Sequence, residues 1–274
     1  MHKMKFIIVA LLIQFVFPQV FGQHFTGKII DDSTGKVIAY SNIGVVHKNI
    51  GTVSDFNGNY SIEINGQFDD DSLRISCIGY YPCVLKVSDF KVLKQHDIYL
   101  KPQIFAIDEV QVTPKFFEQK ILGVTTKSKV AQAGFEENQL GYECGIFFYS
   151  KKSTLVESIH LNVARCTYDT VFYRVNIYKP SGNMEFENIL QQPIYIQLTQ
   201  KEIQDEIIID LKKYNLILSG DFLITLEHVK DVGPGILYFC AGFSNKTYFR
   251  KTSQAAWERA PVGISLSIEA RVEK

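Results

Sequence analysis

Short runs in which apolar and polar residues alternate recur along this chain, and such alternation is the period of half-buried β-strands. The clearest run, Tyr60-Ser-Ile-Glu-Ile64, follows a turn centred on Asn57 and Gly58. A glycine can adopt the positive φ that such a turn requires. A second run, Leu73-Arg-Ile-Ser-Cys77, ends shortly before Gly79. These features predict a strand–turn–strand unit followed by a further strand.

Further strands are predicted on both sides of this unit, at residues 25–30, 39–48, 84–87 and 97–100. The polar loop 66–71 contains three adjacent aspartates, whose oxygens could coordinate calcium. Such a run is more often a solvated loop tip, and we favour that interpretation. Residues 23–101 are therefore predicted to form a first β-sandwich.

The second half of the chain holds eight short apolar runs separated by turn residues, a pattern typical of a jelly-roll sandwich. A length of 274 residues also suggests two domains. We predict an all-β chain whose second domain covers residues 139–274, after a connector at 102–138 with one or two helical turns at 115–122. The eight runs are 144–149, 155–164, 171–178, 194–198, 207–211, 222–229, 235–243 and 263–272.

The first predicted domain contains a series of short motifs that resemble a known family. They are Thr26-Gly-Lys-Ile-Ile-Asp31, Thr34-Gly-Lys-Val-Ile38, Ala39-Tyr-Ser-Asn-Ile43, Gly51-Thr-Val-Ser-Asp55, Asn57-Gly-Asn-Tyr60 and Ile78-Gly-Tyr80. Together they resemble the carboxypeptidase-regulatory-like domain, a small transthyretin-like Greek-key β-sandwich, over residues 24–100.

The resemblance implies a non-catalytic module. In its family the module is found together with zinc carboxypeptidase domains. It also forms the periplasmic N-terminus of outer-membrane receptors of Bacteroidota. The segment Ile107–Pro114 resembles the one that closes the module in those receptors. Only about 160 residues follow it, too few for a receptor barrel of about 22 strands.

The N-terminus has the layout of a secretory signal peptide, which we assign to residues 1–22. Lys3 and Lys5 precede an apolar stretch, Phe6–Phe17, and Val20-Phe-Gly22 offers a small-residue cleavage site. The apolar stretch is shorter than the ~20 residues that span a bilayer. We therefore expect an exported protein of the periplasm, outer membrane or cell surface, without a transmembrane segment after cleavage. An uncleaved anchor is the alternative.

The charge balance and the cysteine spacing limit the classes of function that this chain could have. Lysine plus arginine and aspartate plus glutamate number 29 each, and removal of Lys3 and Lys5 leaves 27 − 29 = −2. This balance argues against a nucleic-acid partner. The five cysteines lack Cys-x-x-Cys spacing. Cys77 and Cys83 could face each other across a hairpin, or all five could be small buried apolar residues.

We find no motif that predicts catalysis or a cofactor. None of the six histidines has a glutamate three residues later, so the zinc site of the carboxypeptidases is missing. Pairs of Cys166 or Cys240 with His160 or His228 are interpreted as core or surface residues. Glu227 and His228 are adjacent on a predicted strand, and their side chains therefore point to opposite faces. We predict no metal, no cofactor and no enzymatic activity.

Aromatic residues of the second domain suggest a ligand face. Most of them are expected to fill the core, but Tyr168, Tyr248 and Trp257 lie in predicted loops. Arg250 and Arg259 flank Trp257, and sugars stack on exposed rings of this kind. The candidate binding residues are therefore Trp257, Tyr248, Arg250 and Arg259.

Three functional hypotheses remain. The first is a non-catalytic secreted binding or scaffold protein of the cell envelope, whose partner is an envelope protein or a glycan. The second is a carbohydrate-binding or glycan-active envelope protein that uses loops of the second domain. The third is an accessory subunit of an outer-membrane receptor.

Overall fold

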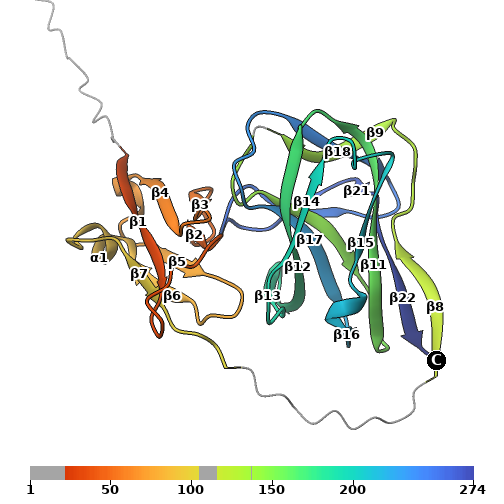
Figure 1. Ribbon diagram of the computed structural model, residues 1–274, viewed down its shortest axis with the longest axis horizontal. Helices are drawn as coiled ribbons and strands as arrows, with labels where there is room; N and C mark the ends of the chain where they lie inside the picture. Colours follow the sequence, from red (N-terminus) through yellow and green to blue (C-terminus); the bar gives the residue numbers. More distant parts are fainter. Residues whose placement is uncertain (1–21, 105–115, 137) are drawn as a thin grey trace, which may run out of the picture.

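The computed structural model describes residues 22–104, 116–136 and 138–274. Almost all of the predicted signal peptide and the whole segment Ile107–Pro114 lie outside the described residues. Two β domains lie side by side, with the first domain at the left of Figure 1 and the second at the right. Among the described residues, no helix has the length and hydropathy needed to cross a bilayer.

The first domain consists of two small sheets that enclose one core. Its three-stranded sheet has the order β4-β1-β7 and its four-stranded sheet the order β3-β2-β5-β6. Ile29, Ile43, Leu73 and Phe90 are fully buried between them. The elements are β1 (Gln23–Asp31), β2 (Asn42–Val45), β3 (Gly51–Val53), β4 (Asn59–Ile64), the 3-10 helix η1 (Gly66–Phe68), β5 (Ser72–Ser76), β6 (Cys83–Lys86), α1 (Val87–Lys91) and β7 (Ile98–Leu100).

The second domain is built from two large sheets. A seven-stranded sheet has the order β13-β12-β17-β10-β19-β20, with β14 also paired to β12. The elements of this sheet are β10 (Glu143–Phe148), β12 (Thr170–Gly182), β13 (Glu185–Asn188), β14 (Ile194–Thr199), β17 (Phe222–His228), β19 (Thr247–Arg250) and β20 (Glu258–Ala260).

An eight-stranded sheet faces it, with the order β21-β18-β11-β22-β8, and with β15 and β16 on β11 and β9 on β18. Its strands are β8 (Phe117–Gly123), β9 (Ala131–Glu136), β11 (Thr154–Cys166), β15 (Glu206–Asp210), β16 (Leu216–Leu218), β18 (Ile236–Gly242), β21 (Gly263–Ile264) and β22 (Leu266–Glu273). The 3-10 helix η2 (Lys212–Tyr214) lies between β15 and β16 in the chain.

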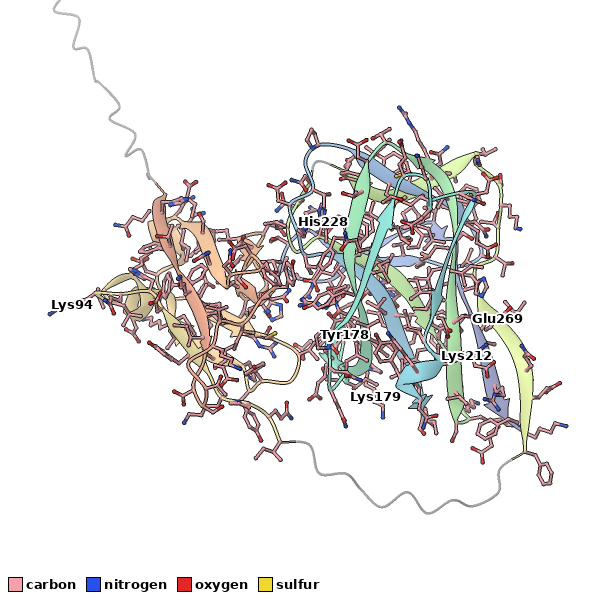
Figure 2. All side chains as sticks on the ribbon, viewed as in Figure 1. Lys94, Tyr178, Lys179, Lys212, His228 and Glu269 are labelled. Carbon is pink, nitrogen blue, oxygen red and sulfur yellow. The ribbon has the colours of Figure 1, made fainter. Side chains whose placement is uncertain are left out.

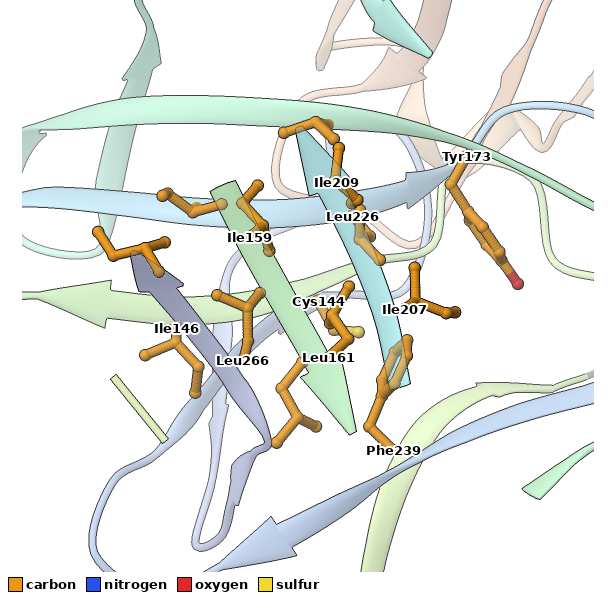
Figure 3. Close-up of a cluster of buried hydrophobic side chains, with 14 of the residues drawn as sticks. Cys144, Ile146, Ile159, Leu161, Tyr173, Ile207, Ile209, Leu226, Phe239 and Leu266 are labelled. Atoms are coloured by element: carbon orange, nitrogen blue, oxygen red, sulfur yellow. The ribbon is translucent and has the colours of Figure 1, made fainter. Parts of the chain in front are cut away.

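Alternate residues of the large sheets form the main core. Figure 3 shows Ile146 and Leu226 from one sheet against Ile159, Leu161 and Leu266 from the other. This packing confirms the predicted all-β fold with two sandwiches in tandem. It also reveals that β10 and β17 are buried on both faces, because every one of their residues is buried.

The helical turns that we predicted at 115–122 are wrong. Residues 117–123 form β8, which pairs with β22, and residues 131–136 of the predicted connector form β9, which pairs with β18. β8 is an edge strand whose residues are mostly exposed, so it lacks the apolar alternation that identifies a strand in sequence. Its conformation comes from the hydrogen bonds to β22.

All five cysteines are free in the structure, including Cys77 and Cys83. Cys144 and Cys240 are buried, whereas the other three are half-buried. Burial raises the pKa of the Cys144 thiol, so it remains protonated at neutral pH.

Candidate functional site

A row of four charged side chains crosses the outer face of the seven-stranded sheet. The strand register places Arg174 of β12 opposite Glu227 of β17, Glu227 opposite Glu143 of β10, and Glu143 opposite Arg250 of β19. Directly opposite residues of neighbouring strands share one face of a sheet. The charges therefore follow the order positive, negative, negative, positive; we call these four residues the charged row.

Hydrogen bonds satisfy both buried carboxylates. Glu227 Oε2 accepts from Arg174 Nη2 at 2.6 Å, and Glu143 Oε2 accepts from Arg250 Nε at 2.7 Å. Asn176 Nδ2 donates to both glutamates, at 2.8 Å to Glu143 and 2.7 Å to Glu227. Both glutamates are 0% exposed. Buried charges of this kind persist only when they are paired and hydrogen-bonded.

The two glutamates differ in acidity. Burial raises the pKa of Glu143, although the opposite charge of Arg250 works against this increase. Burial acts in the same direction on Glu227, but Arg174 and Arg250 outweigh it and hold the pKa of Glu227 below its usual value. Proximity to two guanidinium groups makes Glu227 the more acidic member of the pair.

The first domain covers one end of the charged row. Arg174 Nη1 donates to the carbonyl oxygen of Tyr40 at 2.7 Å, and Asn42 of β2 hydrogen-bonds with both Arg174 and Glu227. Asn42 Nδ2 also donates to Ser253 Oγ at 3.0 Å, and Gln254 Nε2 donates to Ser76 Oγ at 2.9 Å. The network thus joins the two domains directly.

Two glycines of the first domain let the loop after β19 approach closely. A Cβ atom on Gly44 would lie 2.2 Å from the carbonyl oxygen of Ser253, and one on Gly51 would lie 2.3 Å from the same atom. Nearby, Tyr40 and Val53 pack against Val229 in a small apolar cluster. The interface is therefore built from close backbone contact as well as from charge.

A cleft of about 760 Å³ opens beside the charged row, between the loop after β5 and the β12–β13 hairpin. The guanidinium groups of Arg74, Arg174 and Arg250 line it. Figure 2 shows Tyr178 on the side of the second domain that faces the first. The cleft is also lined by the carboxylate of Glu187, the amides of Asn176, Asn188, Gln103 and Gln254, and the rings of Tyr81 and Phe186.

The first domain matches a known family over most of its length. The model of the CarboxypepD_reg-like domain family matches residues 25–112, the last eight of which lie outside the described residues. The N-terminal domain is a CarboxypepD_reg-like domain. This confirms the resemblance found in its sequence motifs.

One curated relative shares the CarboxypepD_reg-like domain. The TonB-dependent receptor SusC of Bacteroides thetaiotaomicron is 31% identical over 110 residues, which are 39% of this chain and 10% of the receptor. The chain thus spans about a tenth of that relative's length.

Two solved structures resemble this chain only weakly. One is a structure of infectious bursal disease virus Gx strain, with a TM-score of 0.20. The other is the VP2 subviral particle of infectious bursal disease virus, with a TM-score of 0.17. Each is 8% identical to this chain. The match to the first covers 93% of this chain and 76% of the viral chain, and the match to the second covers 92% of this chain and 64% of the viral chain. Such scores carry no argument about fold or function.

The candidate binding residues from the sequence fall into three environments. Arg250 belongs to the charged row and lies over the ring of Trp257, 5.0 Å from its centroid. Trp257 is half-buried and packs edge-on against Tyr178. Arg259 is exposed on β20, with its guanidinium 5.9 Å from the centroid of Tyr248.

The expectation that Tyr168 and Tyr248 are exposed is wrong. Tyr168 is 1% exposed and packs in the main core, whereas Tyr248 is 9% exposed because it lies in β19 rather than in a loop. Tyr248 packs with Phe147 and Phe186. Short strands such as β19 offer too few residues for their alternation to be recognised.

Apart from Arg250, sequence reasoning missed the polar residues around which the cleft is built. Arg174, Asn176 and Tyr178 alternate with apolar residues along β12, which was a usable signal that one face of this strand is polar. Nothing in the sequence indicated that the CarboxypepD_reg-like domain would cover that face.

A second polar constellation lies on the outer face of β11. Ser158 Oγ is 2.9 Å from His160 Nε2, and His160 Nδ1 is 2.8 Å from Glu206 Oε1. This order of hydroxyl, imidazole and carboxylate is the one found in nucleophilic hydrolases. The sequence analysis considered pairs of His160 with Cys166 or Cys240 and interpreted them as core or surface residues; the structure brings Ser158 and Glu206 to His160.

The three aspartates of the 66–71 loop are engaged by lysines. Asp69 pairs with Lys91 at 2.6 Å and Asp70 with Lys86 at 2.8 Å. Asp71 lies 3.5 Å from Lys48. Within residues 22–104, 116–136 and 138–274, no group of three or more histidine, cysteine or acidic side chains is arranged to hold a metal ion.

Proposed function

We propose that this chain is an exported, non-catalytic binding protein of the cell envelope, and that its ligand site is the cleft between the two domains. The observation that carries the proposal is the charged row, which joins the domains at one side of the cleft. A cleft of about 760 Å³ is within the usual size of small-ligand sites, roughly 300–1,000 Å³. Its walls belong to two domains that the network holds together.

Two arguments favour binding over catalysis. Glu143 and Glu227 have the divergent pKa values that acid–base pairs show, but they are 0% exposed and their oxygens already accept hydrogen bonds. A substrate would have to displace Arg174, Arg250 or Asn176 to reach them. Their chemistry is therefore that of a structural network.

Among the described residues, the backbone amides nearest Ser158 are not free to stabilise an oxyanion. Residues 158–161 of β11 pair with β15 on one side and with β22 on the other, so their backbone amides already take part in sheet hydrogen bonds. An oxyanion intermediate needs free N–H donors close to the nucleophile. We therefore interpret Ser158, His160 and Glu206 as a polar cluster on a sheet surface.

The location in the cell envelope rests on the predicted signal peptide and on the domain shared with a TonB-dependent receptor. That shared domain also favours a second candidate function, an accessory subunit of such a receptor. Affinity capture from envelope extracts with the mature chain would test it. A stoichiometric receptor in the eluate would support this role, and its absence would contradict it.

Binding in the cleft is tested with a variant that fills it. Ser181 is an exposed residue of the cleft wall, and Ser181→Trp would place a large ring inside. Ser219, exposed in the turn before β17, provides the matched control Ser219→Trp. The mature chain is applied to arrays of envelope glycans and peptides, and the products are analysed for cleavage.

We expect binding that Ser181→Trp abolishes and Ser219→Trp preserves, with every array compound intact. Binding that is unchanged in the Ser181→Trp variant would show that the ligand site lies outside the cleft. Release of new reducing ends or amines by the wild-type chain, absent from a Ser158→Ala variant, would refute the non-catalytic assignment.

A further inference from the structure

The strand β8 is an edge of the eight-stranded sheet, and its outer side has no partner strand. Within the part of the chain that the structure describes, β8 pairs with β22 alone, along all seven of its residues. Figure 1 shows β8 at the right-hand margin of the second domain, on the side away from the first domain. A long unpaired edge is a template for pairing with a further strand.

The hydrogen bonds at the two ends of β8 show which of its backbone groups are unpaired. Lys274 N donates to the carbonyl oxygen of Phe116, and Val124 N donates to that of Leu266, both at 2.9 Å. Hydrogen-bonded pairs alternate along an antiparallel ladder, so the even-numbered residues of β8 bond to β22. The N–H and C=O groups of residues 117, 119 and 121 therefore point away from β22.

The charged side chains of β8 complement one another in one antiparallel register. Glu118 and Lys120 lie on the same face of the strand and pair with each other at 3.1 Å, with side chains 55% and 46% exposed. When Gln119 lies opposite Gln119 of a second copy, each Glu118 lies opposite the partner's Lys120. Both are even-numbered and so occupy non-hydrogen-bonded positions of the new ladder, where facing Cα atoms are only about 4.5 Å apart. The four charges alternate in sign around a square, which stabilises the pairing.

The same register brings exposed apolar side chains together. Phe117 lies opposite the partner's Ile121, which is 63% exposed in the single chain. Phe116, which is 80% exposed, lies opposite the partner's Leu122. Aromatic and branched side chains that face each other across two strands stabilise a sheet. Pairing therefore removes apolar surface from water at both ends of the strand.

The neighbouring registers are unfavourable. Because only odd-numbered residues offer free backbone groups, the register can change only in steps of two residues. One step places Lys120 opposite Lys120, and the opposite step places Glu118 opposite Glu118; like charges that face each other destabilise a sheet. The register that aligns the lysines also requires Gly123, whose φ of 103° lies outside the β region.

We propose that this chain forms a two-fold symmetric dimer in which β8 pairs antiparallel with β8 of a second copy and Gln119 lies at the two-fold axis. The contact is isologous, and it joins two eight-stranded sheets into one. A lysine usually protects a sheet edge from pairing. Here Glu118 supplies the charge that Lys120 needs, and only a second copy presents both charges in the matching order.

The dimer goes beyond the proposed function, because its interface and the cleft lie on different sides of the second domain. The first domain, which forms one wall of the cleft, lies across the second domain from β8 (Figure 1). Both clefts of the dimer therefore remain open. Two sites in one particle increase the avidity for a ligand that carries repeated epitopes.

The test uses charge variants whose effects cancel when they are combined. Sedimentation equilibrium of the mature chain over a concentration series measures the dissociation constant of the dimer. Glu118→Lys and Lys120→Glu each place like charges opposite one another in a homodimer. An equimolar mixture of these two variants, or the double variant that carries both changes, restores opposite charges at every position. The matched control is Glu63→Lys, the same change at an exposed residue of the edge strand β4.

We expect the wild type to dimerise and each single variant of β8 to raise the dissociation constant at least about tenfold, because like charges then face each other. The mixture and the double variant should recover dimerisation, and Glu63→Lys should leave it unchanged. Gln119→Pro removes an N–H that points away from β22, so it should abolish the dimer while the monomer stays folded. Thermal unfolding followed by circular dichroism checks the fold of every variant.

Four outcomes would overturn the inference. A wild-type chain that stays monomeric up to millimolar concentration would refute the dimer. Equal dissociation constants for Glu118→Lys and Glu63→Lys would show that the contact does not use β8. A loss of dimer that neither the mixture nor the double variant restores would refute the register. Amide exchange at residues 119 and 121 should slow as the dimer forms, and exchange independent of protein concentration would contradict pairing at this edge.

Discussion

Replacing Glu227 by glutamine should destabilise the protein strongly. The substitution keeps the shape of the side chain but removes the negative charge that balances Arg174. Arg174 has a side chain only 3% exposed, and its Nη2 and Nε atoms donate to Glu227 at 2.6 and 3.2 Å. Removing one partner of a buried ion pair typically costs about 3–5 kcal/mol, because the other charge stays buried without compensation.

The free energy of unfolding in urea, followed by far-UV circular dichroism, measures this cost. The matched control is Glu157→Gln, which breaks the pair between Glu157, whose side chain is 14% exposed, and Arg271 at 2.8 Å. The Arg271 side chain is 51% exposed, so this variant should lose about 1 kcal/mol or less. A loss in Glu227→Gln no larger than in the control would refute the reasoning.

The same variant tests whether the charged row joins the domains. Asn42 hydrogen-bonds with Glu227, and Tyr40 accepts from Arg174, so both contacts should weaken when the charge is removed. Amide hydrogen exchange at residues 40–45 should then accelerate in Glu227→Gln under native conditions. Unchanged exchange there, together with a large loss of stability, would show that other contacts hold the domains together.

Two further predictions concern single side chains. Hydrogen bonds, above all from Ser33 Oγ at 2.6 Å, lower the pKa of Asp31 from 3.8 to about 2. Its stabilising contribution is therefore complete above the unfolded pKa and disappears as the pH falls towards 2; a carboxyl titration by NMR with a midpoint near 4 would contradict this. The Tyr173 hydroxyl is buried without a partner among the described residues, whereas that of Tyr178 donates to Glu143 at 2.9 Å. Tyr173→Phe should thus be neutral or stabilise by about 1 kcal/mol, and Tyr178→Phe should destabilise by about 1–3 kcal/mol; thermal unfolding that ranks the two variants in the opposite order would contradict the assignment.

The alternation of apolar and polar residues was sufficient to predict the class of fold and most of its strands. The run from Tyr60 to Ile64 became β4, and the run from Leu73 became β5. The motifs around Asn57 and Gly58 also identified the first domain correctly, because turn geometry depends on local residue types. These properties arise from interactions between near neighbours, and near neighbours are visible in a sequence.

The candidate site depends on interactions that a sequence does not display. Glu143, Arg174, Glu227 and Arg250 are far apart along the chain and form one row only because strand register aligns them. Arg250 had been predicted as a candidate binding residue beside Trp257, but nothing in the sequence placed it next to the other three charges. The CarboxypepD_reg-like domain then covered this face, turned exposed charges into a buried network and left a cleft beside Arg74. Composition and pattern therefore determined the two sandwiches, whereas the packing of one sandwich on the other determined which polar groups lost contact with water.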